Sequence, residues 1–402
     1  MSNNACYREM LDRLMPWSSS TCSKRATAMP EEPAVIARGR GCRVWDADDR
    51  EFIDFRNSLG PVTLGYCFPA VDNAIREQLE NGIIFGYPHI LEAEVAQALH
   101  EVIPCAEKVR FLKTGGEAVA AVIKTARYVS GHKHVIQIGY NGWLNSLAAD
   151  GMFLPGQNAQ EQVPGVPADL SVLHHNCRWN DLEQLSLLEK TFGNDLAAIV
   201  VAADYQNTDA GFTFYPALRA MADRCGAALI YDEIVTGFRI ALAGMQEYCG
   251  VVPDMAVFAK AIANGMPLSV YCGKARWMDG LNKAIVSSTY GGESLSLAAA
   301  KAVINVYRTE PVIEHITNMG RKMWGGLNTL FKQYGVPASI PDKFPMGFCK
   351  FEEGNSELHQ KFLRNACKYG VTLYNGGYVN YSHKENDIDE ALDKLETAIK
   401  NL

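Results

Sequence analysis

Two ionisable side chains in the middle of the chain each follow an apolar run that is typical of a buried β-strand. Asp232 comes after the run Ala-Ala-Leu-Ile-Tyr, and Lys260 comes after Val-Phe-Ala. The 28 positions from one to the other leave room for one helical crossover, which would make the two strands parallel. Both side chains would then lie at the carboxyl edge of one sheet, where open α/β sheets bind ligands.

A lysine that is buried away from solvent at such an edge is suited to imine chemistry. Burial disfavours the charged ammonium, lowers the pKa of the lysine and leaves an amine that can attack a carbonyl. A cofactor that acts as an electron sink needs such a lysine and an acid at its ring nitrogen. Each residue alone could be a charged strand end that reaches solvent. The pair at this spacing favours a Schiff-base lysine at Lys260 and a ring-nitrogen partner at Asp232.

A third element is the turn Thr114-Gly115-Gly116, which lies between an apolar run and a helical pattern. Backbone N–H groups at the start of a helix can bind a phosphate, and glycine lets the anion approach. A Gly-Gly pair before a helix is an ordinary turn in most proteins, so this element only adds to the first two. No G-x-G-x-x-G fingerprint is present at this position, which argues against a nicotinamide enzyme.

The segments that must position these residues alternate in their periodicity. They predict helices over 70–80, 92–102 and 118–129, and strands over 108–112, 134–138, 196–202, 227–231 and 255–259. Strands that alternate with helices predict βαβ units and a mainly parallel central sheet covered by helices on both faces. The pattern therefore predicts an α/β fold.

The two ends of the chain show different patterns, which predict a division into three segments. Residues 1–66 hold an arm of weak periodicity and a small antiparallel meander, and residues 67–305 form the large α/β domain. Residues 306–402 form a C-terminal segment that ends in an amphipathic helix over 388–402. We expect the two outer segments to build a smaller α+β domain. Residues 144–180, rich in Pro, Gly, Asn and Gln, predict a long loop.

Composition and charge argue against several kinds of partner. The chain has 402 residues, 48% of them hydrophobic, and its formal net charge of −7 offers no basic footprint for a nucleic acid. Its apolar stretches fall well short of the roughly twenty residues that span a bilayer. The eleven cysteines form no C-x-x-C pair and the first residues lack a secretory pattern, which predicts free thiols in a reducing cytoplasm. The nine histidines show no metal-ligand spacing, so no metal site is predicted.

The most specific stretch of the chain is Tyr-Asp-Glu-Ile-Val-Thr-Gly-Phe-Arg at 231–239, followed by Lys260 and by Gly265-Met266-Pro267. With these motifs the chain resembles the class III pyridoxal-phosphate aminotransferases, and among them most of all the glutamate-1-semialdehyde 2,1-aminomutase branch. The resemblance runs from about Val35 to the C-terminal helix. It implies an aspartate-aminotransferase-like fold with a large domain that binds pyridoxal 5′-phosphate.

The resemblance also implies roles for individual residues. Lys260 would hold the cofactor as a Schiff base and later move protons, Asp232 would pair with the pyridinium nitrogen, and Ile234 would pack on one ring face. The turn Thr114-Gly115-Gly116 would bind the phosphate. Tyr140 matches the aromatic residue that stacks on the ring.

Thr289 resembles the family's threonine that reaches the phosphate of the neighbouring subunit's cofactor. The resemblance therefore implies a homodimer with shared active sites. The chain departs from the family at four places, where the family has His, Glu-Pro, Asn-Pro and a longer, acidic C-terminal segment. At these places this chain has Asn141, Ala202-Ala203-Asp204, Glu293-Ser294 and the segment 373–380. The last three of these departures weaken the case for the aminomutase substrate.

These features predict an aminotransferase that moves an amino group from a small amino donor to a ketone or aldehyde acceptor by ping-pong chemistry. An aminomutase and a racemase share the first proton abstraction, so both stay open as alternatives. By position, Tyr87, His89 and Tyr374 are candidates for substrate contact. The Tyr- and Asn-rich segment around Tyr374 suits a hydroxylated acceptor such as a sugar. A non-catalytic scaffold relative is a remote alternative, which the Asp232 and Lys260 pair disfavours.

Overall fold

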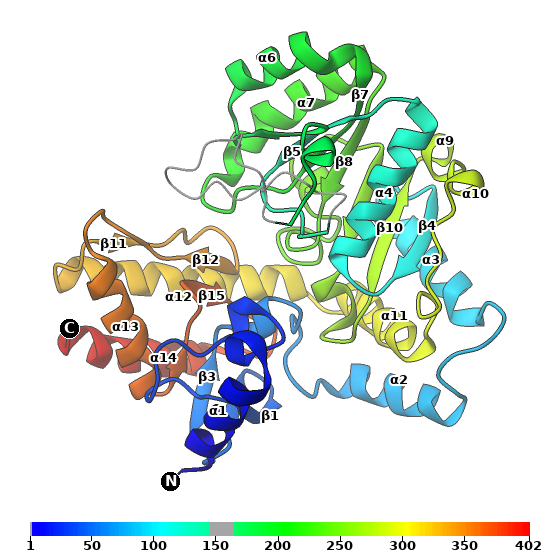
Figure 1. Ribbon diagram of the computed structural model, residues 1–402. Coiled ribbons are helices and arrows are strands. Elements are labelled where there is room, and N and C mark those ends of the chain that lie inside the picture. Colours follow the sequence, from blue (N-terminus) through cyan, green and yellow to red (C-terminus); the bar gives the residue numbers. More distant parts are fainter. Residues whose placement is uncertain (1, 145–164) are drawn as a thin grey trace. The chain divides into compact units, whose positions relative to one another are not determined.

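The computed structural model describes residues 2–144 and 165–402 and divides into two compact units (Figure 1). The large unit is Asn73–Thr309, and the small unit combines Met1–Asp72 with Glu310–Leu402. The large unit is an α/β structure around a mainly parallel sheet, and the small unit is an α+β structure built from both ends of the chain. The fold class predicted from the sequence is confirmed.

A seven-stranded sheet forms the centre of the large unit. Its strands, in spatial order, are β4 (Lys108–Leu112), β10 (Ser269–Gly273), β9 (Met255–Phe258), β8 (Ala228–Asp232), β7 (Leu196–Val201), β5 (His134–Ile138) and β6 (His174–Cys177). β10 pairs antiparallel with both of its neighbours, and the pairs from β9 to β6 are parallel. Every residue of β7, β8 and β9 is buried, which explains their continuous apolar sequences.

Helices pack on this sheet and fix the turns at its edge. The helices of the large unit and its border are α2 (Pro69–Glu80), α3 (Ile90–Val102), α4 (Gly115–Ser130), α5 (Ala168–Ser171), α6 (Leu182–Phe192), α7 (Gly211–Cys225), α8 (Met245–Tyr248), α9 (Ala275–Met278), α10 (Leu281–Ala284) and α11 (Ser294–Thr309). Val119, Val122 and Ile123 of α4 are fully buried in one cluster with Ile230 and Val257 of the sheet. Each such side chain contributes about 1.5–3 kcal/mol on burial, so this contact holds the N-terminus of α4 in place.

The connection from β8 to β9 differs from the helical crossover that the spacing predicts. Residues 233–254 form turns and the one-turn helix α8. The buried Glu233 carboxylate accepts N–H groups of Met245 at 2.8 Å and Gln246 at 3.1 Å, and it also accepts the Thr236 hydroxyl. These bonds fold the connection back on its own start, so a full helix does not form.

The predicted loop over 144–180 is partly wrong. Its residues 145–164 lie outside the part of the chain that the structure describes, but residues 165–180 contain α5 and the strand β6. β6 is an edge strand, paired only with β5 among the described strands. Its sequence, His-His-Asn-Cys, has neither the alternation nor the β-branched residues that make a strand visible in a sequence.

The small unit joins both ends of the chain. Its elements are α1 (Asn3–Leu14), β1 (Ile36–Arg40), β2 (Arg43–Asp46), β3 (Glu51–Asp54), α12 (Val312–Gln333), β11 (Ala338–Ser339), β12 (Met346–Phe348), β13 (Lys350–Phe351), α13 (Ser356–Lys368), β14 (Val371–Thr372), β15 (Gly376–Tyr378) and α14 (Glu385–Lys400). β1, β2 and β3 form an antiparallel meander, and β14 adds to β3 in parallel. The sequence predicts only an arm at the N-terminus, whereas the structure shows α1 there, capped by the Ser2 hydroxyl.

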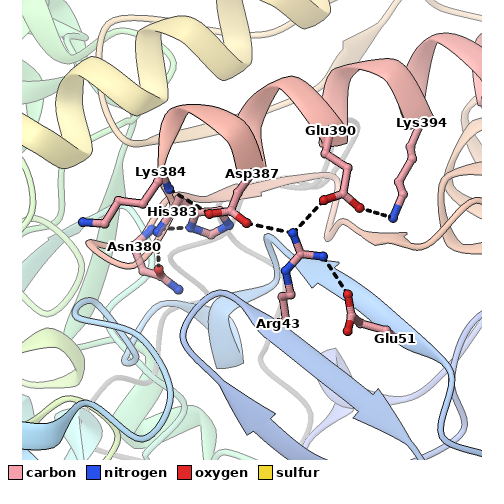
Figure 2. A network of polar contacts seen from close by, with 8 residues as sticks. All are labelled: Arg43, Glu51, Asn380, His383, Lys384, Asp387, Glu390 and Lys394. Atoms are coloured by element: carbon pink, nitrogen blue, oxygen red, sulfur yellow. Dashed lines mark hydrogen bonds and ion pairs between the residues drawn. The ribbon is translucent and has the colours of Figure 1, made fainter.

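One guanidinium ties the two ends of the small unit together (Figure 2). Arg43 of β2 donates to Asp387 at 2.8 Å and to Glu390 at 2.6 Å, both on α14. Beside this contact, the fully buried His383 accepts the N–H of Asn380 through Nδ1 at 3.1 Å (Figure 2). Because the bond needs an unprotonated Nδ1 and the ring is buried, His383 has a structural role in its neutral form.

Each buried histidine of the two units should contribute a loss of stability in acid. Burial lowers the pKa of His174 and His383 to about 3 and that of His175 to about 4. The unfolded chain takes up these protons near pH 6.5 and the folded chain does not, so stability is lost as the pH falls from about 6.5 towards 4. By pH 5 each histidine costs its unit about 2 kcal/mol. Thermal unfolding at pH 7 and pH 5 measures this loss.

The variant His383→Gln removes one of these titrations and serves as the control. It should show a smaller fall in melting temperature between pH 7 and pH 5 than the parent chain. A change in melting temperature between pH 7 and pH 5 that is the same in His383→Gln and in the parent chain would contradict the expectation.

Three further features of the described residues bear on function. No helix among residues 2–144 and 165–402 is long and apolar enough to cross a membrane. In the same part of the chain, no group of three or more His, Cys, Asp or Glu side chains is arranged to hold a metal ion. The eleven cysteines are free thiols.

Candidate active site

Lys260 occupies a strained position at the carboxyl end of β9. It begins the short 3-10 helix η6 (Lys260–Ala263), with a φ of +50°, which is left-handed and rare for a side chain with a Cβ. Burial and, to a lesser extent, the Arg239 guanidinium lower the pKa of Lys260 to about 8, against the opposing effect of the Asp232 carboxylate. A lysine with this pKa has about one tenth of its amine uncharged at pH 7, far more than an ordinary lysine.

Asp232 is the last residue of β8, the parallel neighbour of β9. The register pairs it with Val257, three residues before Lys260, so both side chains lie at the same edge of the sheet. Its carboxylate accepts the N–H of Ile234 at 3.1 Å and the side-chain N–H of Asn141 at 3.3 Å. Burial raises the pKa of Asp232 to about 6, against these bonds and the Lys260 charge. The carboxyl is therefore mostly ionised at neutral pH.

The turn before α4 has the geometry of an anion site. Thr114 caps the helix and forms a capping box with Glu117, so Gly115 and Gly116 are its first two residues. The first N–H groups of a helix lack partners within the helix and carry the positive end of its dipole. A Cβ on Gly115 would lie 2.4 Å from Cδ1 of Ile234. This close approach brings the turn next to the segment that follows Asp232.

The remaining candidates on the large unit are more exposed. Tyr140 is 55% exposed and immediately precedes Asn141, the partner of Asp232. Thr289 lies on an exposed turn. Tyr87 is 86% exposed, whereas the His89 ring caps α3 by accepting the N–H of Leu91 at 3.3 Å.

Tyr374 belongs to the small unit. The Arg56 guanidinium lies over its ring at 5.4 Å from the centroid. The ring lines a cavity of about 270 Å³ whose other walls include Arg25 and Asn375. The N-terminal arm and the C-terminal segment around Tyr374 thus contribute to one cavity in this unit.

Sequence reasoning gave no role to two residues that contact or influence the central pair. Asn141 stands where the family usually has His, and its bond to the Asp232 carboxylate becomes visible only when β5 and β8 are in place. Arg239 is fully buried and its charge acts on Lys260, although the sequence shows it only as the end of a motif. The sequence motif was the one available signal for Arg239, because charged residues are rarely fully buried without a partner or a functional role.

Taken together, the residues at this edge fit a phosphorylated ring that carries an aldehyde. The helix start at Gly115 and Gly116 suits the phosphate, and the buried Asp232 carboxylate suits a protonated ring nitrogen. Lys260 offers an amine that can form an imine. A buried carboxylate and a lysine of lowered pKa at one sheet edge are costly for the fold, which is typical of functional sites.

Comparisons with known proteins agree with this chemistry. The family model "Aminotransferase class-III" matches residues 25–399. The chain is 30% identical to a glutamate-1-semialdehyde 2,1-aminomutase of Persephonella marina, over 92% of each chain. Among solved structures, the PLP internal aldimine form of the FumI protein of Sphingopyxis sp. MTA144 has a TM-score of 0.89 at 23% identity, covering 99% of this chain and 96% of that one.

A second solved structure supports the same fold. An omega-transaminase from Sphaerobacter thermophilus has a TM-score of 0.90 at 21% identity, covering 99% of this chain and 97% of that one. The family expected from the sequence is confirmed, and so is its enzymatic character. The chain belongs to the class-III aminotransferases, enzymes that use pyridoxal phosphate.

Proposed function

We propose that this chain binds pyridoxal 5′-phosphate at the carboxyl edge of β8 and β9 and moves an amino group from a small amino donor to a ketone or aldehyde acceptor. One observation carries the proposal: Lys260, with a pKa of about 8, and the buried carboxylate of Asp232 share one sheet edge. The phosphate would bind at Thr114, Gly115 and Gly116. Ile234 and Tyr140 would lie against the ring.

The cofactor, when bound, supplies an aldehyde that bonds to amines and a ring that accepts the electrons of the Cα–H bond. Lys260 would hold the cofactor through its amine. The Lys260 amine would also remove the Cα proton of the donor, and its pKa of about 8 suits a general base near neutral pH. Asp232 keeps a negative charge beside the ring nitrogen, and Asn141 orients that carboxylate. Lys260 finally returns the proton to another carbon.

An aminomutase is the second candidate function, because curated relatives at 28–30% identity are glutamate-1-semialdehyde 2,1-aminomutases. The site residues serve both reactions equally well. Transamination ranks first because this chain departs from the family at Asp204, at Glu293-Ser294 and in the segment 373–380. Tyr87, His89 and Tyr374 are proposed to contact the substrate, and the polar, aromatic segment around Tyr374 suits a hydroxylated acceptor.

A panel of amino donors tests the proposal. Purified protein loaded with pyridoxal phosphate is mixed with each donor without acceptor, and the absorbance change reports conversion of the cofactor to its amine form. A stoichiometric keto product supports transamination. Isomerisation of glutamate-1-semialdehyde supports the aminomutase, and exchange of the Cα hydrogen without amine transfer supports a racemase. A chain that takes up no cofactor would refute the proposal and favour a scaffold role.

We also propose a homodimer in which Thr289 reaches the partner's cofactor phosphate. Thr289 and Tyr290 are exposed on one turn, and Tyr290 is 62% exposed. A run of exposed apolar side chains leads into the first residue of α3: Ile83, Ile84, Phe85, Tyr87 and Ile90. Apolar surface of this kind is typical of protein interfaces. The free cysteines support a reducing cytoplasm as the compartment.

The variant Gly115→Ala should bind pyridoxal phosphate at least about tenfold more weakly, a loss of about 1.4 kcal/mol. The new Cβ would lie 2.4 Å from Cδ1 of Ile234 and would keep an anion away from the helix start. Adding Ile234→Val removes that atom and should restore part of the affinity. An absorbance titration with pyridoxal phosphate measures both.

Gly86→Ala is the control, because a Cβ there meets nothing within 4 Å. It should bind the cofactor like the parent chain. If Gly115→Ala also retains the parent affinity, the phosphate does not bind at this turn.

A further inference from the structure

An ion pair connects the phosphate-binding turn to the segment that carries Thr289. Lys113 directly precedes Thr114, and its Nζ lies 2.9 Å from Oε2 of Glu293. The two side chains are only 15% and 11% exposed. Exposed ion pairs contribute little, but the loss of one partner of an ion pair shielded from water is costly because it leaves an uncompensated charge.

Glu293 is fixed from its other side by the start of α11. Its carboxylate accepts the N–H of Leu295 at 2.6 Å and both the N–H and the hydroxyl of Ser296, at 3.3 and 2.6 Å. Burial alone would raise the pKa of Glu293, but the Ser296 hydroxyl and the Lys113 ammonium hold it below its ordinary value. The Glu293 carboxylate is therefore charged and is held in place beside Lys113 by these hydrogen bonds.

A second contact fastens the same segment to β4. A Cβ on Gly291 would lie 2.7 Å from the carbonyl oxygen of Phe111, so only glycine allows this approach. Residues 288–293 thus meet the carboxyl end of β4 twice, at Phe111 and at Lys113. A shift of one segment must move the other.

We propose that Lys113 and Glu293 are positioning residues that couple cofactor binding to dimer formation. The inference rests on the proposed function, in which Thr114–Gly116 bind the phosphate and Thr289 reaches the partner's cofactor. The ion pair fixes both segments in one arrangement. Coupling of this kind is reciprocal: the factor by which the cofactor strengthens the dimer equals the factor by which dimerisation strengthens cofactor binding.

The test uses full-length protein and four variants. Lys113→Met removes the charge and Lys113→Arg keeps it. Glu293→Gln removes the negative charge and keeps one acceptor oxygen for the N–H groups at the start of α11. Lys108→Met is the matched control, because Lys108 lies at the other end of β4 and pairs with Asp279 where both side chains are about half exposed. Absorbance titration measures the dissociation constant of pyridoxal phosphate, and sedimentation measures dimer dissociation with and without it.

Lys113→Met and Glu293→Gln should each bind pyridoxal phosphate at least about tenfold more weakly, and their dimers should no longer tighten when it is added. Lys113→Arg should keep most of the coupling, and Lys108→Met should behave like the parent chain. Thermal unfolding of the cofactor-free proteins shows whether each variant folds. If Lys113→Met does not fold, the comparison of Glu293→Gln with Lys108→Met decides.

Two results would overturn the inference while leaving the proposed function intact. In the first, the parent chain binds the cofactor, and the folded Lys113→Met and Glu293→Gln variants show the same cofactor affinity and the same coupling to dimer formation. The other is an equal loss in Lys108→Met. A parent chain that takes up no pyridoxal phosphate would contradict the proposed function and this inference with it.

Discussion

Replacing Lys260 by alanine should lower amino transfer on the order of 10⁴-fold, because the variant loses both its covalent link to the cofactor and its general base. The parent protein loaded with pyridoxal phosphate and treated with borohydride should carry the cofactor on the peptide that contains Lys260. The variant should carry no such label. Steady-state kinetics and peptide mass analysis measure the two effects.

A matched control is Lys283→Ala, since Lys283 is an exposed lysine on α10. It should keep full activity and the label on Lys260. A label on another lysine, or transfer in Lys260→Ala within tenfold of the parent rate, would exclude Lys260 as the residue that holds the cofactor.

The backbone at position 260 adds a stability effect to this loss of activity. A residue with a Cβ at a φ of +50° costs about 1 kcal/mol or more relative to glycine. Lys260→Gly should therefore unfold at a higher temperature than Lys260→Ala, although both are inactive. Equal melting temperatures would show that the left-handed backbone carries no strain. A higher melting temperature for Lys260→Gly would mean that the backbone conformation that orients the Lys260 side chain lowers the stability of the fold.

The sequence predicts the central pair because burial leaves a clear pattern. β8 and β9 are buried on both faces, so they appear as apolar runs, and the charged residue at the end of each run marks the sheet edge. β4 and β5 are found with the same bounds in the sequence and in the structure. Local composition is sufficient to predict a strand where the hydrophobic pattern depends on that strand alone.

Features that depend on tertiary contacts leave no such pattern. β10 is a short strand whose ends are Ser269 and Gly273, and pairing with two neighbours defines it. The turns after β8 depend on the Glu233 carboxylate, which is bonded to residues 12 and 13 positions further on. The bond from Asn141 to Asp232 joins residues 91 positions apart. Such contacts follow from the assembled sheet and not from a local window.

Asp232→Asn should lower the catalytic efficiency on the order of 10³-fold, because the neutral amide no longer holds the ring nitrogen protonated. The affinity of the parent chain for pyridoxal phosphate should also fall below about pH 6, where the carboxyl becomes protonated. The variant should lack this dependence. Kinetics at pH 8 and cofactor titrations from pH 5 to 8 measure both effects. Parent-like efficiency in Asp232→Asn would rule out this ring contact.

The same substitution should make the cofactor-free protein more stable. Burial raises the pKa of Asp232 from 3.8 to about 6, so the folded state holds a proton that the unfolded state has already lost between these pH values. The parent chain therefore loses about 3 kcal/mol as the pH rises from 3.8 through 6, and Asp232→Asn does not. At pH 7 the variant should melt at a higher temperature, with the difference shrinking towards pH 4. A variant that is less stable than the parent at pH 7 would mean that the ionised carboxylate stabilises the empty site.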